Sequence, residues 1–297
     1  MKIGFVGLGI MGHAMAANLQ RAGHEVMAHD LRKVEGFPRW ANSPAEAATG
    51  CEVVFTSLPG PAEVRAVGEA LREVMPRGSA WFDLSTNSPQ CVRGLHAQFA
   101  KSGVHVLDAP VSGGPAGAKS GKLAIWVGGE RAVFDKHLPI LKAIGDEPYY
   151  VGAIGAGTIA KLAHNCATFT LQAAMTEVFT LGVKAGVDPL DLFKAVRQGA
   201  SGRKRTFDRM AETFLPHKFD PPAFSLRLAH KDMTLALDLA EKEKVPMRLA
   251  KLAMESMTEA MARGWEGRDF RAFLTLQEER AGVSVQVAEE KLRQVLG

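Results

Sequence analysis

Short apolar runs alternate with amphipathic stretches over the first half of the chain. The apolar runs predict strands at residues 3–6, 25–29, 53–58, 79–84, 104–107, 123–127 and 149–151. The stretches between them predict helices that run through Leu19, that follow Pro61, and that cover about 89–101 and 131–144. Strands that alternate with helices indicate an α/β fold with a mostly parallel, doubly wound sheet.

This alternation stops near Gly152, and only helical periodicity follows. A long helix is expected over residues 157–185, where no proline occurs, and it would be roughly 40 Å long at the usual rise per residue. Further helices are expected over 189–198, 207–213, 228–244, 247–263 and from 270 to the C-terminus. A chain of 297 residues is typical of two domains. We therefore predict an α/β domain over 1–153 and an all-helical domain over 154–297.

The composition narrows the classes of protein to consider. Hydrophobic residues make up 46% and charged residues 23%, which excludes disordered, collagen-like and coiled-coil proteins. A net charge of +4 suits small anionic ligands and does not indicate nucleic acid. Three scattered cysteines and the absence of clustered histidines predict neither a disulfide framework nor a metal site. The uncharged stretch 162–176 is too short to span a membrane, and no signal peptide is visible, so we expect a cytoplasmic protein.

A glycine motif follows the first expected strand directly. Its sequence, Gly7-Leu8-Gly9-Ile10-Met11-Gly12, fits G-x-G-x-x-G and opens the first expected helix. Glycines at these positions permit a tight turn and let the backbone approach a pyrophosphate, which the N-terminus of the helix attracts. In this context all six residues are predicted to bind a dinucleotide, although glycine turns without a ligand also join strands to helices.

Asp30 ends the second expected strand at about the distance from the glycines that places a carboxylate on the adenosine ribose. A carboxylate accepts hydrogen bonds from ribose hydroxyls and repels a 2′-phosphate, which favours NAD over NADP. Arg32 is the opposing signal, because an arginine there can bind that phosphate. A plain solvated turn is the alternative for Asp30.

The carboxyl ends of the later strands should line the same cleft. They carry Ser57-Leu58-Pro59, Asp83-Leu84-Ser85-Thr86 and Asp108-Ala109-Pro110-Val111-Ser112-Gly113-Gly114. The Ser112-Gly113-Gly114 stretch can present backbone N–H groups and a hydroxyl to a carboxylate. A glycine-rich loop without a ligand has equal weight when this stretch is considered alone.

Lys161 and Asn165 lie four residues apart in the long helix, which places both on one face. The sequence around them is apolar or neutral, so this face is expected to be buried. Partial desolvation lowers the pKa of a lysine and makes it a usable acid or base. A lysine whose stem covers apolar surface while its amine stays in water is the alternative.

Taken together, these motifs resemble those of the β-hydroxyacid dehydrogenases related to 3-hydroxyisobutyrate dehydrogenase and tartronate semialdehyde reductase. Four signatures carry the resemblance: F-x-G-L-G-x-M-G at 5–12, D-A-P-V-S-G-G at 108–114, G-x-G-x-x-x-K-x-x-x-N at 155–165, and the pair Lys231-Asp232. Many members have two asparagines where this chain has His164-Asn165. The stretch between Asp30 and Leu58 is short for the family, so we expect a reduced helix there.

The resemblance implies a Rossmann domain joined by the long helix to an all-α domain, and reversible transfer of a hydride between NAD(P) and a small β-hydroxy acid. It implies that Lys161 is the general acid/base and that Asn165 helps to hold Lys161 and the substrate. It also implies that Ser112, Gly113 and Gly114 bind the substrate carboxylate, and that Leu58, Pro59, Thr86 and Lys231 lie along the cofactor.

Several alternatives stay open. The substrate is one of 3-hydroxyisobutyrate, tartronate semialdehyde or glycerate, a hydroxymethyl dicarboxylate, L-serine or sulfolactaldehyde. A non-catalytic dinucleotide-binding module of the same fold is the second class of function, and the retained Lys161 argues against it. The basic run Arg203-Lys204-Arg205 is a solvated turn or attracts a second anionic group. The long apolar helix predicts a homodimer or homotetramer.

Overall fold

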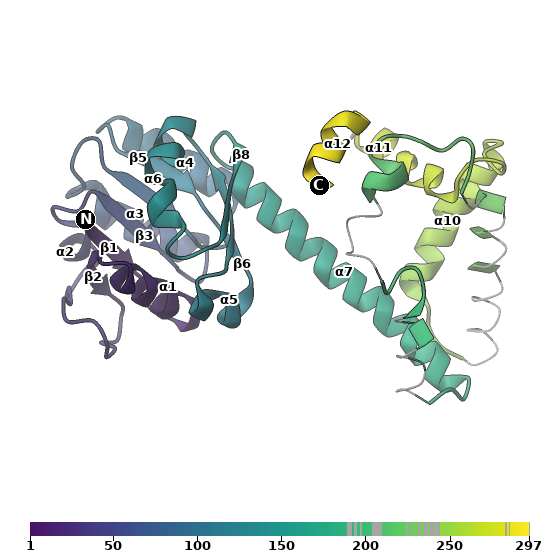
Figure 1. The fold of residues 1–297 in the computed structure, drawn as a ribbon, viewed down its shortest axis with the longest axis horizontal. Helices are drawn as coiled ribbons and strands as arrows, with labels where there is room; N and C mark the ends of the chain where they lie inside the picture. The colour runs from purple at the N-terminus through teal and green to yellow at the C-terminus, as the bar shows by residue number, and fades with distance from the viewer. Residues whose placement is uncertain are drawn as a thin grey trace. The chain divides into compact units, whose positions relative to one another are not determined.

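The chain folds into two units, Met1–Ala167 and Thr168–Gly297, in a computed structural model (Figure 1). The structure describes residues 1–188, 192, 195–196, 198–203, 210–223, 225–227, 229–230, 233–234, 237, 241, 244–282, 284 and 286–296. Within these residues no helix is both long enough and apolar enough to cross a membrane.

A single mixed sheet forms the centre of the first unit. Its strands are β1 (Lys2–Val6), β2 (Glu25–His29), β3 (Val53–Thr56), β4 (Ala80–Asp83), β5 (His105–Asp108), β6 (Val111–Ser112), β7 (Ala124–Gly128) and β8 (Glu147–Gly152). The order is β2-β1-β3-β4-β5-β7-β6, and β8 pairs with β7. The first five strands are parallel, as predicted, whereas β7 runs antiparallel to β5 and to β6.

Helices of the first unit lie between the strands along the chain. They are α1 (Ile10–Arg21), α2 (Pro44–Ala48), α3 (Pro61–Arg72), α4 (Pro89–Ala100), α5 (Gly114–Ser120) and α6 (Arg131–Leu141). Four of the six were expected from the hydrophobic pattern. The five-residue α2 agrees with the reduced helix expected before β3. Serines begin two of the helices, because Ser43 Oγ accepts from the Glu46 N–H and Ser88 Oγ from the Cys91 N–H.

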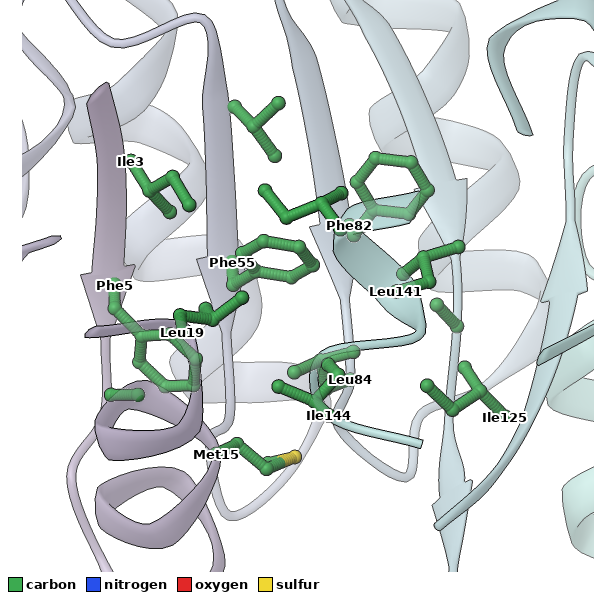
Figure 2. Close-up of a cluster of buried hydrophobic side chains, with 14 of the residues drawn as sticks. Ile3, Phe5, Met15, Leu19, Phe55, Phe82, Leu84, Ile125, Leu141 and Ile144 are labelled. Atoms are coloured by element: carbon green, nitrogen blue, oxygen red, sulfur yellow. The ribbon is translucent and has the colours of Figure 1, made fainter. Parts of the chain in front are cut away.

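Both faces of the sheet are buried, because neighbouring side chains of a strand point to opposite sides. On one face Phe5, Phe55 and Phe82 pack with residues of α1 and of the α6 region (Figure 2). On the other face Val54 and Trp81 pack with apolar residues of α3 and α4. This double burial explains why β3 and β4 are continuous apolar runs.

Helix α7 (Ala156–Lys184) leaves the sheet unit and has 29 residues, which confirms the long helix expected over 157–185. The described residues of the second unit form a π-turn η1 (Met210–Phe214), α10 (Arg248–Ala262), a 3-10 turn η2 (Phe270–Leu274), α11 (Thr275–Ala281) and α12 (Glu289–Leu296). Leu226, Met257, Ala260 and Leu276 are buried together there. The helix expected over 247–263 is confirmed by α10.

One expectation for the second unit is wrong. We expected a continuous helix from residue 270 to the C-terminus, but η2, α11 and α12 are separate elements. Helix α11 ends because Gly282 takes a left-handed conformation with φ 66°. The helices expected over 189–198 and 228–244 lie largely outside the described residues, as does the start of the one expected at 207–213, whose last part is the π-turn η1.

Candidate active site

The glycine motif forms the turn between β1 and α1, and two of its glycines are required by close packing. Gly7 has a φ of 95°, and a Cβ there would overlap the carbonyl oxygen of Ser57. A Cβ on Gly12 would overlap the carbonyl oxygen of Gly7. At Gly9, by contrast, a Cβ would meet no heavy atom within 4 Å. A side chain at Gly9 would therefore project into open space in front of the helix N-terminus.

That open space belongs to a cavity of about 550 Å³ in the first unit. Its lining comes from the glycine turn and from the ends of β2 and β3: Val6, Gly7, Gly9, Ile10, Met11, Gly12, His29, Asp30, Leu31, Pro44, Ser57, Leu58, Pro59, Glu63, Ala66 and Val67. Among the described residues, no side chain caps the first turn of α1, so its N–H groups are left for a bound anion. The cavity therefore offers the open space and the free N–H groups that binding of a dinucleotide pyrophosphate requires.

Asp30 stands half-buried at the end of β2 and supports the glycine turn. Its Oδ2 accepts a hydrogen bond from the Leu8 N–H at 2.5 Å. Its Oδ1 lies 3.4 Å from the Arg32 backbone nitrogen, a weak contact, and the side chain of Arg32 is exposed. The carboxylate thus keeps acceptor capacity toward the cavity, where a ribose would lie.

Two predicted cofactor residues, Leu8 and Thr86, do not line the cavity. Leu8 is buried in the hydrophobic core of the sheet unit. Thr86 is exposed just after β4 and is not among the residues that line the cavity. Lys231 lies outside the described residues, together with Asp232, Lys204 and Arg205. Arg203 is exposed. Among the residues that the structure describes, no group of three or more His, Cys, Asp or Glu side chains could hold a metal ion.

Asp83 was expected to line the cleft at the end of β4, and this expectation is wrong. The side chain is buried, and its carboxylate accepts from Thr56 Oγ1 at 2.9 Å and from Asn87 Nδ2 at 2.8 Å. Burial raises the pKa of Asp83, and these hydrogen bonds oppose the rise. Ser85 Oγ in turn accepts from the Leu58 N–H at 2.9 Å. Asp83 therefore holds together the turns after β3 and β4.

The expectation that Asp108 lines the cleft at the end of β5 is also wrong. Only 1% of Asp108 is exposed, so the carboxylate does not face a cleft. Its Oδ1 accepts from the Gly155 N–H at 2.7 Å and its Oδ2 from the Thr158 N–H at 2.5 Å. Both donors belong to the start of α7, where N–H groups lack partners within the helix. Asp108 therefore caps α7 from a distant strand and fixes where this helix leaves the sheet.

In the second turn of α7, Lys161 lies beside the strand β7. Its Nζ is 5.9 Å from the centroid of the Trp126 ring, within the range of a cation–π contact. The side chain is half-buried, and burial lowers the pKa of its amine. Asn165 is half-buried one turn further along the same helix. The predicted desolvation of Lys161 is thus present in the structure.

The loop predicted to bind a carboxylate contacts the turn of α7 that carries this lysine. Ser112 ends β6, and its Oγ is 3.3 Å from Nε2 of His164 on α7. Gly113 and Gly114 follow with φ angles of 134° and 61° and are exposed at the start of α5. Their positive φ angles require glycine, which explains the motif. The structure therefore brings Ser112 together with the turn of α7 that carries Lys161.

Trp126 was not predicted as a site residue, but its ring contacts both Lys161 and His164. The ring centroids of Trp126 and His164 are 5.1 Å apart. Burial, and secondly the charge of Lys161, lower the pKa of His164. A large aromatic residue in the middle of an otherwise buried strand was the available signal for Trp126.

Both halves of the chain match known protein families. Residues 2–155 match the family described as the NAD binding domain of 6-phosphogluconate dehydrogenase. Residues 155–277 match the family described as NAD-binding of NADP-dependent 3-hydroxyisobutyrate dehydrogenase. Together the two families cover the sheet unit and most of the second unit.

Characterised relatives match over nearly their full length. The chain is 34% identical to 2-(hydroxymethyl)glutarate dehydrogenase of Eubacterium barkeri, over 96% of this chain and 97% of that one. It is 34% identical to 3-hydroxyisobutyrate dehydrogenase of Pseudomonas aeruginosa, over 84% and 89%. Among solved structures, 3-hydroxyisobutyrate dehydrogenase of Mycobacterium tuberculosis with L-serine matches with a TM-score of 0.65 and 30% identity, over 93% and 98%.

Proposed function

Because the chain belongs to the β-hydroxyacid dehydrogenase family, we propose that it oxidises a small β-hydroxy acid reversibly, with NAD as the hydride acceptor. The substrates that fit the proposal best are 3-hydroxyisobutyrate and the pair tartronate semialdehyde and glycerate. The observation that carries it is the half-buried Lys161, which lies on the turn of α7 whose His164 contacts Ser112. Burial lowers the pKa of Lys161, which favours proton transfer. A non-catalytic binding module does not require such a lysine.

The mechanism follows from the chemistry of these side chains. NAD, when held by the glycine turn and Asp30, would supply the acceptor for the hydride that leaves the carbon bearing the hydroxyl. Lys161 Nζ takes the hydroxyl proton during oxidation and returns it during reduction. Ser112 Oγ and the N–H groups of Gly113 and Gly114 hold the carboxylate, and Asn165 helps to hold Lys161 and the substrate. Holding the substrate in one orientation supplies several kcal/mol of the barrier reduction, on the order of what positioned reactants gain.

Turnover of a panel of acids tests this function directly. The panel holds 3-hydroxyisobutyrate, glycerate, 2-(hydroxymethyl)glutarate, L-serine and 2,3-dihydroxypropane-1-sulfonate, the alcohol that corresponds to sulfolactaldehyde, each with NAD. We expect NADH formation with at least one acid and a clear preference within the panel. NAD binding without turnover of any acid would instead support the non-catalytic module.

We expect NAD to be preferred over NADP by more than tenfold in kcat/KM. The carboxylate of Asp30 stands at the ribose end of the cavity, where it repels a 2′-phosphate. Asp30→Asn keeps an acceptor for the Leu8 N–H but removes the charge, so the preference should narrow by at least tenfold. Steady-state kinetics with both cofactors measure this. A preference for NADP above tenfold in the unsubstituted enzyme would contradict it and assign Arg32 to the phosphate.

We also propose that α7 packs against a second copy of this chain. Ile159, Leu162, Leu171, Met175 and Val183 on this helix are each at least 40% exposed, an apolar area that a second copy would cover. Light scattering at micromolar concentration should give the mass of a dimer or tetramer. Met175→Glu should lower that mass, whereas Leu252→Glu on α10 should not. A monomeric mass for the unsubstituted protein would refute the proposal.

A further inference from the structure

The contact between Ser112 and His164 joins two segments that are far apart in the sequence. Ser112 Oγ lies 3.3 Å from His164 Nε2, and both residues are half-buried. The imidazole ring also packs against Trp126, with the centroids 5.1 Å apart and the planes at 50°. The ring is therefore held from two sides, by an aromatic face and by a hydroxyl.

A serine hydroxyl carries one hydrogen and can rotate to suit its surroundings. When His164 Nε2–H donates to Oγ, the hydrogen of the Ser112 hydroxyl must point to another acceptor. The acceptor that the proposed function supplies is the substrate carboxylate. Burial and the nearby charge of Lys161 lower the pKa of His164, so the imidazole is neutral near pH 7 and carries a single N–H to donate.

We propose that His164 is a positioning residue for the substrate carboxylate. Its Nε2 holds the Ser112 hydroxyl in the orientation that donates to the carboxylate, and the Trp126 ring fixes the imidazole plane. His164 acts through Ser112 and does not touch the reacting atoms. The inference rests on the proposed function, in which Ser112 binds a carboxylate.

Two substitutions at His164 separate its hydrogen bond from its packing. His164→Phe keeps an aromatic ring against Trp126 but removes the nitrogen that contacts Ser112. His164→Gln places an amide N–H near the position of Nε2. We expect His164→Phe to raise KM for the hydroxy acid about tenfold while kcat changes less than about threefold, the effect of one lost hydrogen bond in binding. His164→Gln should restore KM to within about threefold of the original value.

A double-mutant cycle shows whether His164 acts through Ser112. Ser112→Ala alone should raise KM, and adding His164→Phe to it should raise KM no further. If the KM increases of the two single variants multiply in the double variant, the two residues act independently and the inference is overturned. A fall in kcat with KM unchanged in His164→Phe would also overturn it, because the histidine would then act on the reaction itself.

Equilibrium binding of isobutyrate to the NAD-loaded enzyme separates this inference from the proposed function. Isobutyrate has the carboxylate but no hydroxyl to oxidise, so binding is measured without turnover. We expect its Kd to rise about tenfold in His164→Phe, in parallel with KM. If the unsubstituted enzyme oxidises hydroxy acids but its Kd for isobutyrate is the same in His164→Phe, this inference alone is overturned. An enzyme that neither binds isobutyrate nor oxidises any acid overturns the proposed function as well.

Discussion

Replacing Lys161 by alanine should lower kcat by about 10²–10⁴, the range typical of a lost general acid or base. The amine lies half-buried beside Trp126, where burial lowers its pKa and brings it closer to the pH at which the enzyme works. NAD affinity should change little, because the glycine turn and Asp30 are on other elements. Single-turnover kinetics and NAD titration of the purified variant measure the two quantities separately.

Lys161→Arg distinguishes proton transfer from simple attraction of the carboxylate. A guanidinium keeps the positive charge but cannot release a proton near neutral pH. We therefore expect kcat in Lys161→Arg to stay far below that of the unsubstituted enzyme. Near-full activity would show that Lys161 only anchors the substrate electrostatically. His164 would then be the first proton carrier to test, since it lies in the same turn of α7.

Removing the buried Asp108 carboxylate should lower the free energy of unfolding much more than removing an exposed carboxylate. Asp108→Ala leaves the N–H groups of Gly155 and Thr158 without their buried acceptor, and each such loss costs about 1–3 kcal/mol. We expect the free energy of unfolding to fall by about 2–5 kcal/mol in Asp108→Ala. Asp108→Asn keeps one acceptor oxygen and should lose about half as much. Urea denaturation followed by tryptophan fluorescence measures both variants.

Asp135→Ala is the matched control. Asp135 is an exposed carboxylate on α6 that pairs with Arg131 at 2.9 Å. Exposed pairs contribute little, so its loss should change the free energy of unfolding by less than about 1 kcal/mol. Equal effects at positions 108 and 135 would show that the carboxylate of Asp108 does not stabilise the start of α7.

The strands of the first unit could be predicted because parallel strands buried on both faces are continuous apolar runs. The direction of a strand is not encoded in such a run, so the antiparallel placement of β7 was not predicted. Helices α2 and α5 have five and seven residues, too few to show a helical period. The end of α11 could have been predicted from the sequence, because a glycine, Gly282, follows its last residue.

At the candidate site, the sequence predicted which residues lie on the glycine turn and on the first turns of α7. It could not distinguish a strand-end carboxylate that faces a ligand from one that turns inward. Asp30 lines the cavity, whereas Asp108 is buried because the start of α7 packs closely on β7. That packing depends on Gly157, where a Cβ would overlap the Trp126 carbonyl oxygen. Contacts of this kind appear only once the chain has folded.

The cap that Asp108 supplies to α7 has a consequence for the order in which the chain folds. The first turn is the costly step in forming a helix, whereas each later residue adds one hydrogen bond for each residue fixed. Once the sheet has formed, Asp108 holds that first turn, and α7 can extend through residue 184 into the second unit. During synthesis the N-terminal unit is completed first. We therefore expect residues 168–184 to become helical early and to form a template on which the rest of the second unit can collapse.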